Sequence, residues 1–165
     1  MPNRWKPNVT VAAVIERDGR FLLVEEQTAQ GLCLNNPAGH LDPGETLVQA
    51  CRRETLEETA HAFVPTALVG VYLSGPGSRR ALAGAPRTRL TYLRFAFCGE
   101  LGAFEPTRAL DQGIERTVWM GIDEIRASRG RHRSPMLLRC IEDYLAGARY
   151  PLDMLHTDPT LFVAS

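Results

Sequence analysis

Basic and acidic side chains are equal in number in this 165-residue sequence, 19 of each, so neither sign of charge is in excess. Binding to a nucleic acid or to an acidic membrane relies on a surplus of lysine and arginine. Aromatic residues, which could stack on bases, make up only 7% of the chain. We therefore expect no nucleic-acid partner and no membrane partner.

The cysteines are few and scattered, and no two of them form a Cys-x-x-Cys pair: Cys33, Cys51, Cys98 and Cys140. This spacing indicates neither a zinc site nor a disulfide framework, and it favours small buried thiols in a reducing compartment. The sequence also lacks an uncharged apolar run of the roughly 18 residues that a membrane span needs. No apolar stretch follows the first charged residues, so we expect no signal peptide and a cytoplasmic protein.

The length and the 44% of hydrophobic residues are sufficient for a buried core, and they predict a single domain over residues 1–165. Apolar and β-branched runs predict strands over 8–15, 21–24, 67–73, 91–97 and 116–120. The first two strands should form a hairpin around Asp18-Gly19. Residues 27–36 are expected to form a loop, residues 37–41 a short extended segment, and residues 42–44 a turn.

Helices are predicted over 46–59, 121–127 and 135–146, so the fold class is α/β or α+β. Thr46 and Gln49 have the spacing of a capping box at the start of the first helix. Four of its residues fall on one side and should face a sheet: Leu47, Val48, Cys51 and Thr55.

Three glutamates, Glu54, Glu57 and Glu58, lie on the first predicted helix. Residues spaced i, i+3 and i+4 project within an arc of about 100°, so these carboxylates should lie side by side. Such an oxygen-rich site suits Mg²⁺ or Mn²⁺, which bind phosphate oxygens in turn. The alternative is a solvated helix face with ion pairs to the neighbouring arginines.

Gly39, Glu45 and Arg53 precede this cluster at spacings that carry a resemblance. The pattern Gly-x5-Glu-x7-Arg-Glu-x2-Glu-Glu over residues 39–58 resembles the signature of the Nudix hydrolases. The sequence departs from that signature at Thr55, Ala60 and His61. Because Ala60 stands where the family has a glycine, we expect a cost of about 1 kcal/mol or a shifted helix exit.

The resemblance implies a mixed β-sheet sandwiched between helices, with the signature forming a loop–helix–loop. It implies that Glu54, Glu57, Glu58 and the Gly39 carbonyl hold Mg²⁺, or else Mn²⁺, with Glu54 as the first candidate for the general base. It also implies an ion pair between Glu45 and Arg53. This pair would orient the helix and its loop, and so support the site without taking part in the chemistry.

Several residues outside the signature are weaker candidates. Asp111 and Glu115 could be an extra metal ligand or base, or simply part of a polar loop. Arg94, which strand alternation sends opposite to Leu93 and Phe95, is the best candidate for a basic substrate contact, with His40 beside Gly39 as a second. Arginines in the segment 74–89 could close over an anion or lie in a surface loop, and Glu25 and Glu26 are expected at the surface.

The flanking segments resemble the NudJ-type branch of Nudix phosphatases over roughly residues 5–155: Trp5-Lys-Pro-Asn-Val-Thr-Val-Ala, Val24-Glu-Glu-Gln-Thr, Tyr92-Leu-Arg-Phe, Arg133-Ser-Pro and Arg149-Tyr-Pro-Leu-Asp-Met. This implies Mg²⁺-dependent hydrolysis of small pyrophosphates: hydroxymethylpyrimidine pyrophosphate, thiamine pyrophosphate and nucleoside di- and triphosphates. One alternative is a hydrolase of ADP-ribose or dinucleoside polyphosphates, and another is a non-catalytic module that senses a nucleotide. We expect a monomer or a homodimer.

Overall fold

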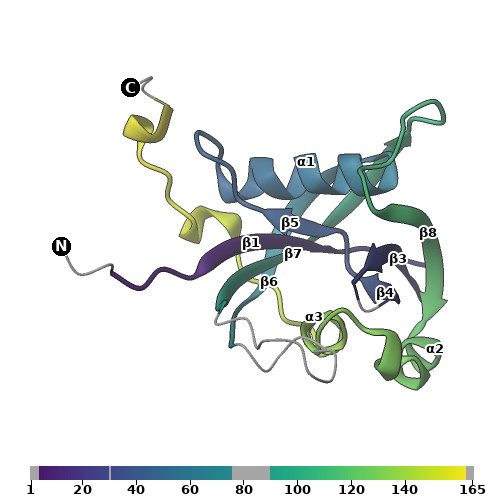
Figure 1. Cartoon of the computed structure of the whole chain (residues 1–165). Helices are drawn as coiled ribbons and strands as arrows, with labels where there is room; N and C mark the ends of the chain where they lie inside the picture. Colours follow the sequence, from purple (N-terminus) through teal and green to yellow (C-terminus); the bar gives the residue numbers. More distant parts are fainter. Residues whose placement is uncertain (1–3, 30, 76–89, 163–165) are drawn as a thin grey trace.

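The structure, a computed structural model, describes residues 4–29, 31–75 and 90–162 (Figure 1). Its strands are β1 (Asn8–Val14), β2 (Glu16–Arg17), β3 (Arg20–Thr28), β4 (Gly31–Asn35), β5 (Ala38–His40), β6 (His61–Ser74), β7 (Tyr92–Phe104) and β8 (Ile114–Gly121). Its helices are α1 (Leu47–Thr59), α2 (Ile122–Ala127) and α3 (Met136–Leu145), with short 3₁₀ turns at Arg129–Arg131, Leu152–Met154 and Pro159–Phe162. None of the helices in these ranges is long and apolar enough to span a membrane.

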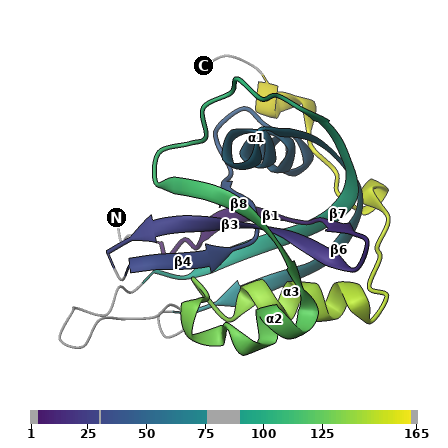
Figure 2. The ribbon, with the colours of Figure 1, turned by 90° about the vertical axis from the view of Figure 1, so that its right-hand side faces the viewer.

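The strands form two four-stranded sheets. The first has the order β5-β1-β7-β6, in which β1 runs parallel to β7 and antiparallel to β5, and β6 runs antiparallel to β7. In the second, β3 pairs antiparallel with β2, β4 and β8. Helix α1 covers one side of the sheets, whereas α2 and α3 cover the other (Figures 1 and 2). The predicted sandwich of mixed sheets between helices is confirmed.

Strand β1 contributes side chains to the core on both faces of its sheet. Its alternate residues Val11 and Ala13 join a buried cluster with Cys51 of α1. Ala12, between them, joins a second cluster with Ile141 of α3. Successive strand residues point to opposite faces, so a continuous apolar run is what a strand covered on both sides requires. All four cysteines are buried free thiols, as predicted.

The predicted hairpin around Asp18-Gly19 was correct in its turn and wrong in its strands. Both turn residues have positive φ angles, 52° for Asp18 and 74° for Gly19, as a tight hairpin turn requires. However, the strand that pairs with β3 across this turn is the two-residue β2. The run 8–15 belongs mostly to β1, whose two backbone edges pair with β5 and β7 in the first sheet and not with β3.

The predicted loop over 27–36 was also wrong, because β3 continues to Thr28 and then pairs with β4. Gly31, with a φ of 97°, allows the chain to reverse between them. Cys33 and Leu34 of β4 are buried, so this hairpin adds to the core.

Strands β6 and β7 are longer than predicted, because they pair with each other along most of their length. Their ladder shifts register near Pro65, which cannot donate a backbone hydrogen bond. Opposite it, a Cβ atom on Gly99 would lie 2.0 Å from the Val64 carbonyl oxygen, so a glycine is needed at this close approach.

Helix α1 begins and ends as predicted. The Thr46 hydroxyl accepts a hydrogen bond from the Gln49 amide (3.1 Å), and the Gln49 side chain accepts one from the Thr46 amide (2.8 Å). Ala60 ends the helix in the left-handed conformation, with a φ of 56°, so the missing glycine has not shifted the exit past this residue. Burial of the Ala60 methyl group offsets part of the roughly 1 kcal/mol that this conformation costs.

Thr46→Ala should lower the free energy of unfolding by about 1 kcal/mol, because it leaves the Gln49 amide without its capping oxygen. Urea denaturation measures the effect. Thr46→Ser, which keeps the hydroxyl, is the matched control and should lose much less. Equal destabilisation by the two substitutions would show that the hydroxyl does not cap this helix.

Candidate active site

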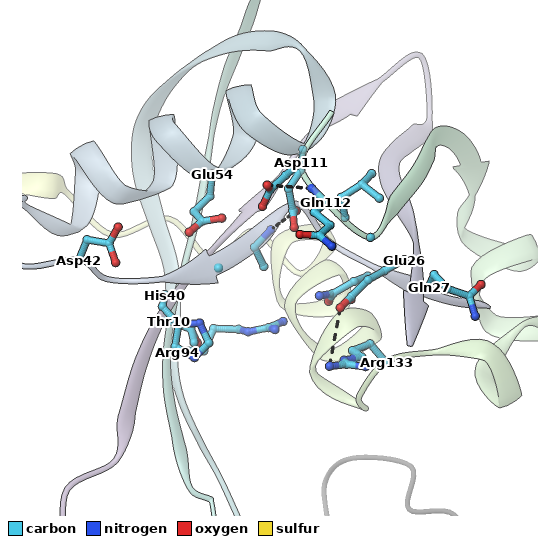
Figure 3. A pocket seen from close by; sticks show the side chains of 16 residues that line it. Thr10, Glu26, Gln27, His40, Asp42, Glu54, Arg94, Asp111, Gln112 and Arg133 are labelled. Atoms are coloured by element: carbon cyan, nitrogen blue, oxygen red, sulfur yellow. Dashed lines mark hydrogen bonds and ion pairs between the residues drawn. The ribbon is translucent and has the colours of Figure 1, made fainter. Parts of the chain in front are cut away.

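A pocket of about 420 Å³, called the central pocket below, lies where α1 meets residues from both sheets (Figure 3). Five carboxylates and two guanidinium groups line it: Glu26, Asp42, Glu54, Glu58 and Asp111, and Arg94 and Arg133. In Figure 3 Glu54 and Asp111 lie on one side, beside α1, and Arg94 and Arg133 lie on the other. The central pocket therefore has an acidic wall, formed by Glu54, Glu58 and Asp111, and a basic wall, formed by Arg94 and Arg133, with Glu26 beside Arg133.

Arg53 organises the acidic wall. Its guanidinium donates to both carboxylate oxygens of Glu45 (2.7 and 3.0 Å) and to the backbone carbonyl of His40 (2.9 Å). It also donates to Glu54 (2.8 Å) and to Glu57 (3.0 Å). The predicted ion pair with Glu45 is therefore present, and these hydrogen bonds hold the pKa of Glu45 below its ordinary value.

Glu54 and Glu58 are the most deeply buried carboxylates of the acidic wall, each less than 10% exposed. Glu58 accepts a hydrogen bond from the Ala38 amide (2.8 Å). Burial still raises the pKa of Glu58 to about 8, with the neighbouring Glu54 adding to the rise. Burial likewise raises the pKa of Glu54, although Arg53 opposes it. Both carboxylates therefore lack sufficient positive charge around them.

The Gly39 backbone lies close to the Glu54 carboxylate. A Cβ atom at Gly39 would lie 2.0 Å from the Glu54 carboxyl carbon, so any side chain there would displace this carboxylate. The absence of a side chain at Gly39 thus leaves room for the carboxylate beside the β5 backbone.

Asp111 is brought to the acidic wall and Glu115 is not. The Asp111 amide donates to the Glu57 carbonyl (2.9 Å), which attaches the loop before β8 to the end of α1. The negative charge of Asp111 helps to raise the pKa of both Glu54 and Glu58. Glu115 is exposed on β8 and does not line the central pocket.

Arg94 and His40 both line the central pocket. Arg94 is only 8% exposed, and its Nη1 atom has no hydrogen-bond partner in the described part of the chain. His40 is exposed at the rim, with its ring 6.3 Å from that of Tyr92. The four arginines predicted as a possible cover over residues 74–89 lie outside the described residues.

Sequence reasoning missed other lining residues, among them Thr10, Glu26, Asn35 and Arg133. Thr10 had a readable signal, because it is a polar residue within the apolar run 8–15, which was expected to form a strand. Asn35 had no such signal, because residues 27–36 were expected to form a loop. Arg133 had none, because it lies in an arginine-rich segment whose simplest interpretation is a solvated connector.

The expectation that Glu25 lies at the surface was wrong. Glu25 is 3% exposed and pairs with Arg116 (2.6 Å) and with Arg131. Arg116 and Arg131 belong to β8 and to the 3₁₀ turn at Arg129–Arg131, so this one carboxylate joins both to β3. Glu26, beside it, lines the central pocket.

The acidic wall fits a hard divalent cation. As they lie, no three His, Cys, Asp or Glu side chains among the described residues are grouped closely enough to form a complete metal site. The donor chemistry is nevertheless suitable, because Glu54 and Glu58 are buried carboxylates short of positive charge. Gly39 leaves space beside Glu54 that a side chain would fill.

The chain belongs to the Nudix family, since the sequence profile of the NUDIX domain matches residues 5–140. It is a hydrolase that acts on phosphoric anhydrides. Phosphatase NudJ from Escherichia coli K12 is 38% identical over 152 residues, which cover 92% of each protein.

Solved structures agree with this assignment. A NUDIX hydrolase from Nitrosomonas europaea is 52% identical, with a TM-score of 0.84 over 93% of this chain and 98% of that one. A MutT NUDIX hydrolase from Burkholderia pseudomallei, 22% identical, has a TM-score of 0.62 over 84% of this chain and 98% of that one, and shares the fold.

Gly39→Ala should reduce hydrolysis by about 100-fold, because the new methyl group displaces the Glu54 carboxylate by more than an ångström. The melting temperature should change little, since the displaced group is the end of a flexible side chain. Gly130→Ala is the control, because its added methyl group meets no atom within 4 Å. Full activity of the Gly39→Ala variant would contradict this account of Gly39.

Glu25→Gln should lower the free energy of unfolding at pH 7 by about 1–2 kcal/mol, because it leaves Arg116 and Arg131 without their anion. Arg116 and then Arg131 lower the pKa of Glu25 below its ordinary value of 4.5, against the effect of burial. The ionised carboxylate therefore stabilises the fold above that ordinary value, and this contribution is lost as the pH falls through the folded-state pKa.

Urea denaturation at several pH values, with the exposed Glu115→Gln as control, tests this pH dependence. The stability difference between the wild-type protein and Glu25→Gln should shrink as the pH falls below 4.5, the ordinary pKa. A difference that stays constant down to the lowest pH at which the protein remains folded would contradict the prediction.

Proposed function

We propose that this protein hydrolyses the pyrophosphate bond of small phosphorylated compounds with Mg²⁺, for which Mn²⁺ can substitute. The substrates are hydroxymethylpyrimidine pyrophosphate, thiamine pyrophosphate and nucleoside di- and triphosphates. The observation that carries this proposal is the central pocket itself, with two undercompensated carboxylates, Glu54 and Glu58, facing a buried Arg94. The similarity to a phosphatase over 92% of the chain supports it.

The metal would be held by Glu54 and Glu58 of the acidic wall, by the Gly39 carbonyl, and by Glu57, which shares Arg53 with Glu54 but does not line the central pocket. A bound divalent cation supplies positive charge for the diphosphate and lowers the pKa of a water molecule. Arg53 holds Glu54 and Glu57 in place, and Glu45 in turn fixes Arg53. Arg53 and Glu45 are thus positioning residues.

The attacking water must lose a proton as its oxygen bonds to phosphorus and the bridging P–O bond breaks. Glu54 is the first candidate to accept that proton, because burial raises its pKa toward the working range of a general base. Asp111, which faces the same carboxylates, is the candidate for an extra ligand or an alternative base. Glu115, which lies on β8 and does not line the central pocket, is the weaker of these two candidates.

Arg94 and His40 are the proposed substrate contacts, since both line the central pocket.

The cytoplasmic location, the single-domain organisation and the monomeric or homodimeric state stay predictions.

Glu58→Gln should lower kcat by at least ~100-fold in Mg²⁺, because it removes a carboxylate from the proposed metal site. Glu100→Gln, an exposed glutamate away from the central pocket, is the control and should be fully active. Phosphate release across the proposed substrates, with a chelator added in parallel, measures both. Unchanged turnover by Glu58→Gln, or turnover in the presence of the chelator, would refute the proposed metal site.

The same panel separates the alternatives. Orthophosphate release from the small pyrophosphates supports the proposal. AMP release from ADP-ribose or a dinucleoside polyphosphate, with the small pyrophosphates untouched, favours a hydrolase of larger diphosphates. Tight nucleotide binding without turnover in Mg²⁺ or Mn²⁺ would favour a sensing module.

A further inference from the structure

We propose that Arg94 and Arg133 together form a subsite for a terminal phosphate group, so that the enzyme selects substrates that end in a free phosphate. This inference rests on the proposed function and specifies its substrate class. It assigns the basic wall of the central pocket to one end of the substrate and leaves the acidic wall to the metal.

Arg94 is a buried cation without a matching anion in the described part of the chain. It is 8% exposed, its Nη1 atom has no hydrogen-bond partner, and no carboxylate lies within ion-pair distance of it among the described residues. The Cys140 thiol interacts with Arg94, but burial raises the pKa of this thiol, so it is neutral and supplies no negative charge. Burying an unpaired guanidinium costs several kcal/mol, so this arrangement is best explained by an anion that binds there during function.

Thr10 stands beside Arg94 and adds a second unsatisfied group. Thr10 on β1 is in register with Arg94 on β7 and with His40 on β5, so the three side chains lie in one row across the sheet. All three line the central pocket. The Thr10 hydroxyl is buried and also has no partner in the described part of the chain. A hydroxyl and a guanidinium pointing into one polar pocket are suitable donors for phosphate oxygens.

Arg133 approaches the same place from the connector before α3. Its amide donates to the Leu34 carbonyl (2.8 Å), which fixes the connector before α3 against β4. Its guanidinium lies 3.7 Å from Glu26, too far for a hydrogen bond, so the partnership is loose (Figure 3). Arg94, Arg133 and Thr10 also line a small adjoining cavity of about 20 Å³, together with Ser134.

The positive charge of this subsite favours a terminal phosphate over a phosphate inside a doubly esterified diphosphate. A terminal phosphate carries about two negative charges near pH 7 and three terminal oxygens, which match two guanidinium groups. Each phosphate inside a diphosphate that is esterified at both ends carries about one charge. The acidic wall would repel either substrate without its metal. A compound with a free terminal phosphate therefore gains more from Arg94 and Arg133 than a doubly esterified diphosphate does.

The experiment compares two substrates that differ in this terminal group, guanosine diphosphate and P1,P2-diguanosine diphosphate. Arg133→Gln should lower kcat/KM for guanosine diphosphate by at least ~10-fold, because it removes a charge-assisted hydrogen bond. It should change kcat/KM for the doubly esterified substrate much less. Arg129→Gln, an exposed arginine on the same connector that does not line the central pocket, is the matched control. Equal losses on both substrates, or no loss on either, would overturn the proposal.

A binding measurement keeps this test separate from the test of the proposed function. Calorimetric titration of chelator-treated protein with inorganic phosphate should give weaker binding, by at least ~10-fold, for Arg133→Gln and for Arg94→Gln than for wild type and Arg129→Gln. The melting temperature of each variant confirms that it is folded. If wild type hydrolyses neither nucleotide, the proposed function fails, whereas the binding titration still decides the subsite. Phosphate binding that is equal in all four proteins would overturn it.

Discussion

The guanidinium of Arg53 joins the two parts of the sequence that make the acidic wall. Through its contacts with the His40 carbonyl and Glu45 it holds the loop before α1, and through Glu54 and Glu57 it holds the helix itself. Arginine suits this position because its planar group presents several donors in a fixed geometry, which lysine cannot do. Without a cation between them, carboxylates so close together would repel one another.

Arg53 compensates only part of the negative charge. Glu58 lies beyond its reach and is held instead by a single backbone amide, that of Ala38. The remaining charge faces a basic wall built from β7 and the connector before α3. The charge of the central pocket therefore changes sign from one wall to the other. This suits a substrate that is bound through a cation at the acidic wall and by the guanidinium groups themselves at the basic wall.

The acidic wall was predictable from the sequence because it is local. The capping box at Thr46, the extent of α1 and the spacing of its glutamates depend on residues a few positions apart. The ion pair of Glu45 with Arg53 followed from the family resemblance. The basic wall depends on strand order instead, because Arg133 meets Arg94 only when the second sheet packs beside the first. The burial of Glu25 likewise requires β8, which lies far away in the sequence, and the hairpin of β3 and β4 was missed because its turn residues resembled a loop.

The parallel pairing of β1 with β7 has a consequence for how the chain reaches its native state. Asn8 pairs with Tyr92, and Val14 pairs with Cys98, so the first strand finds this neighbour only after more than half of the chain is available. Bringing such distant segments together has an entropic cost of loop closure. Proteins that depend on long-range parallel pairing therefore fold slowly. During synthesis on the ribosome, the edge of β1 that pairs with β7 must therefore stay without this partner until β7 has emerged, and an unpaired strand edge favours aggregation before folding is complete.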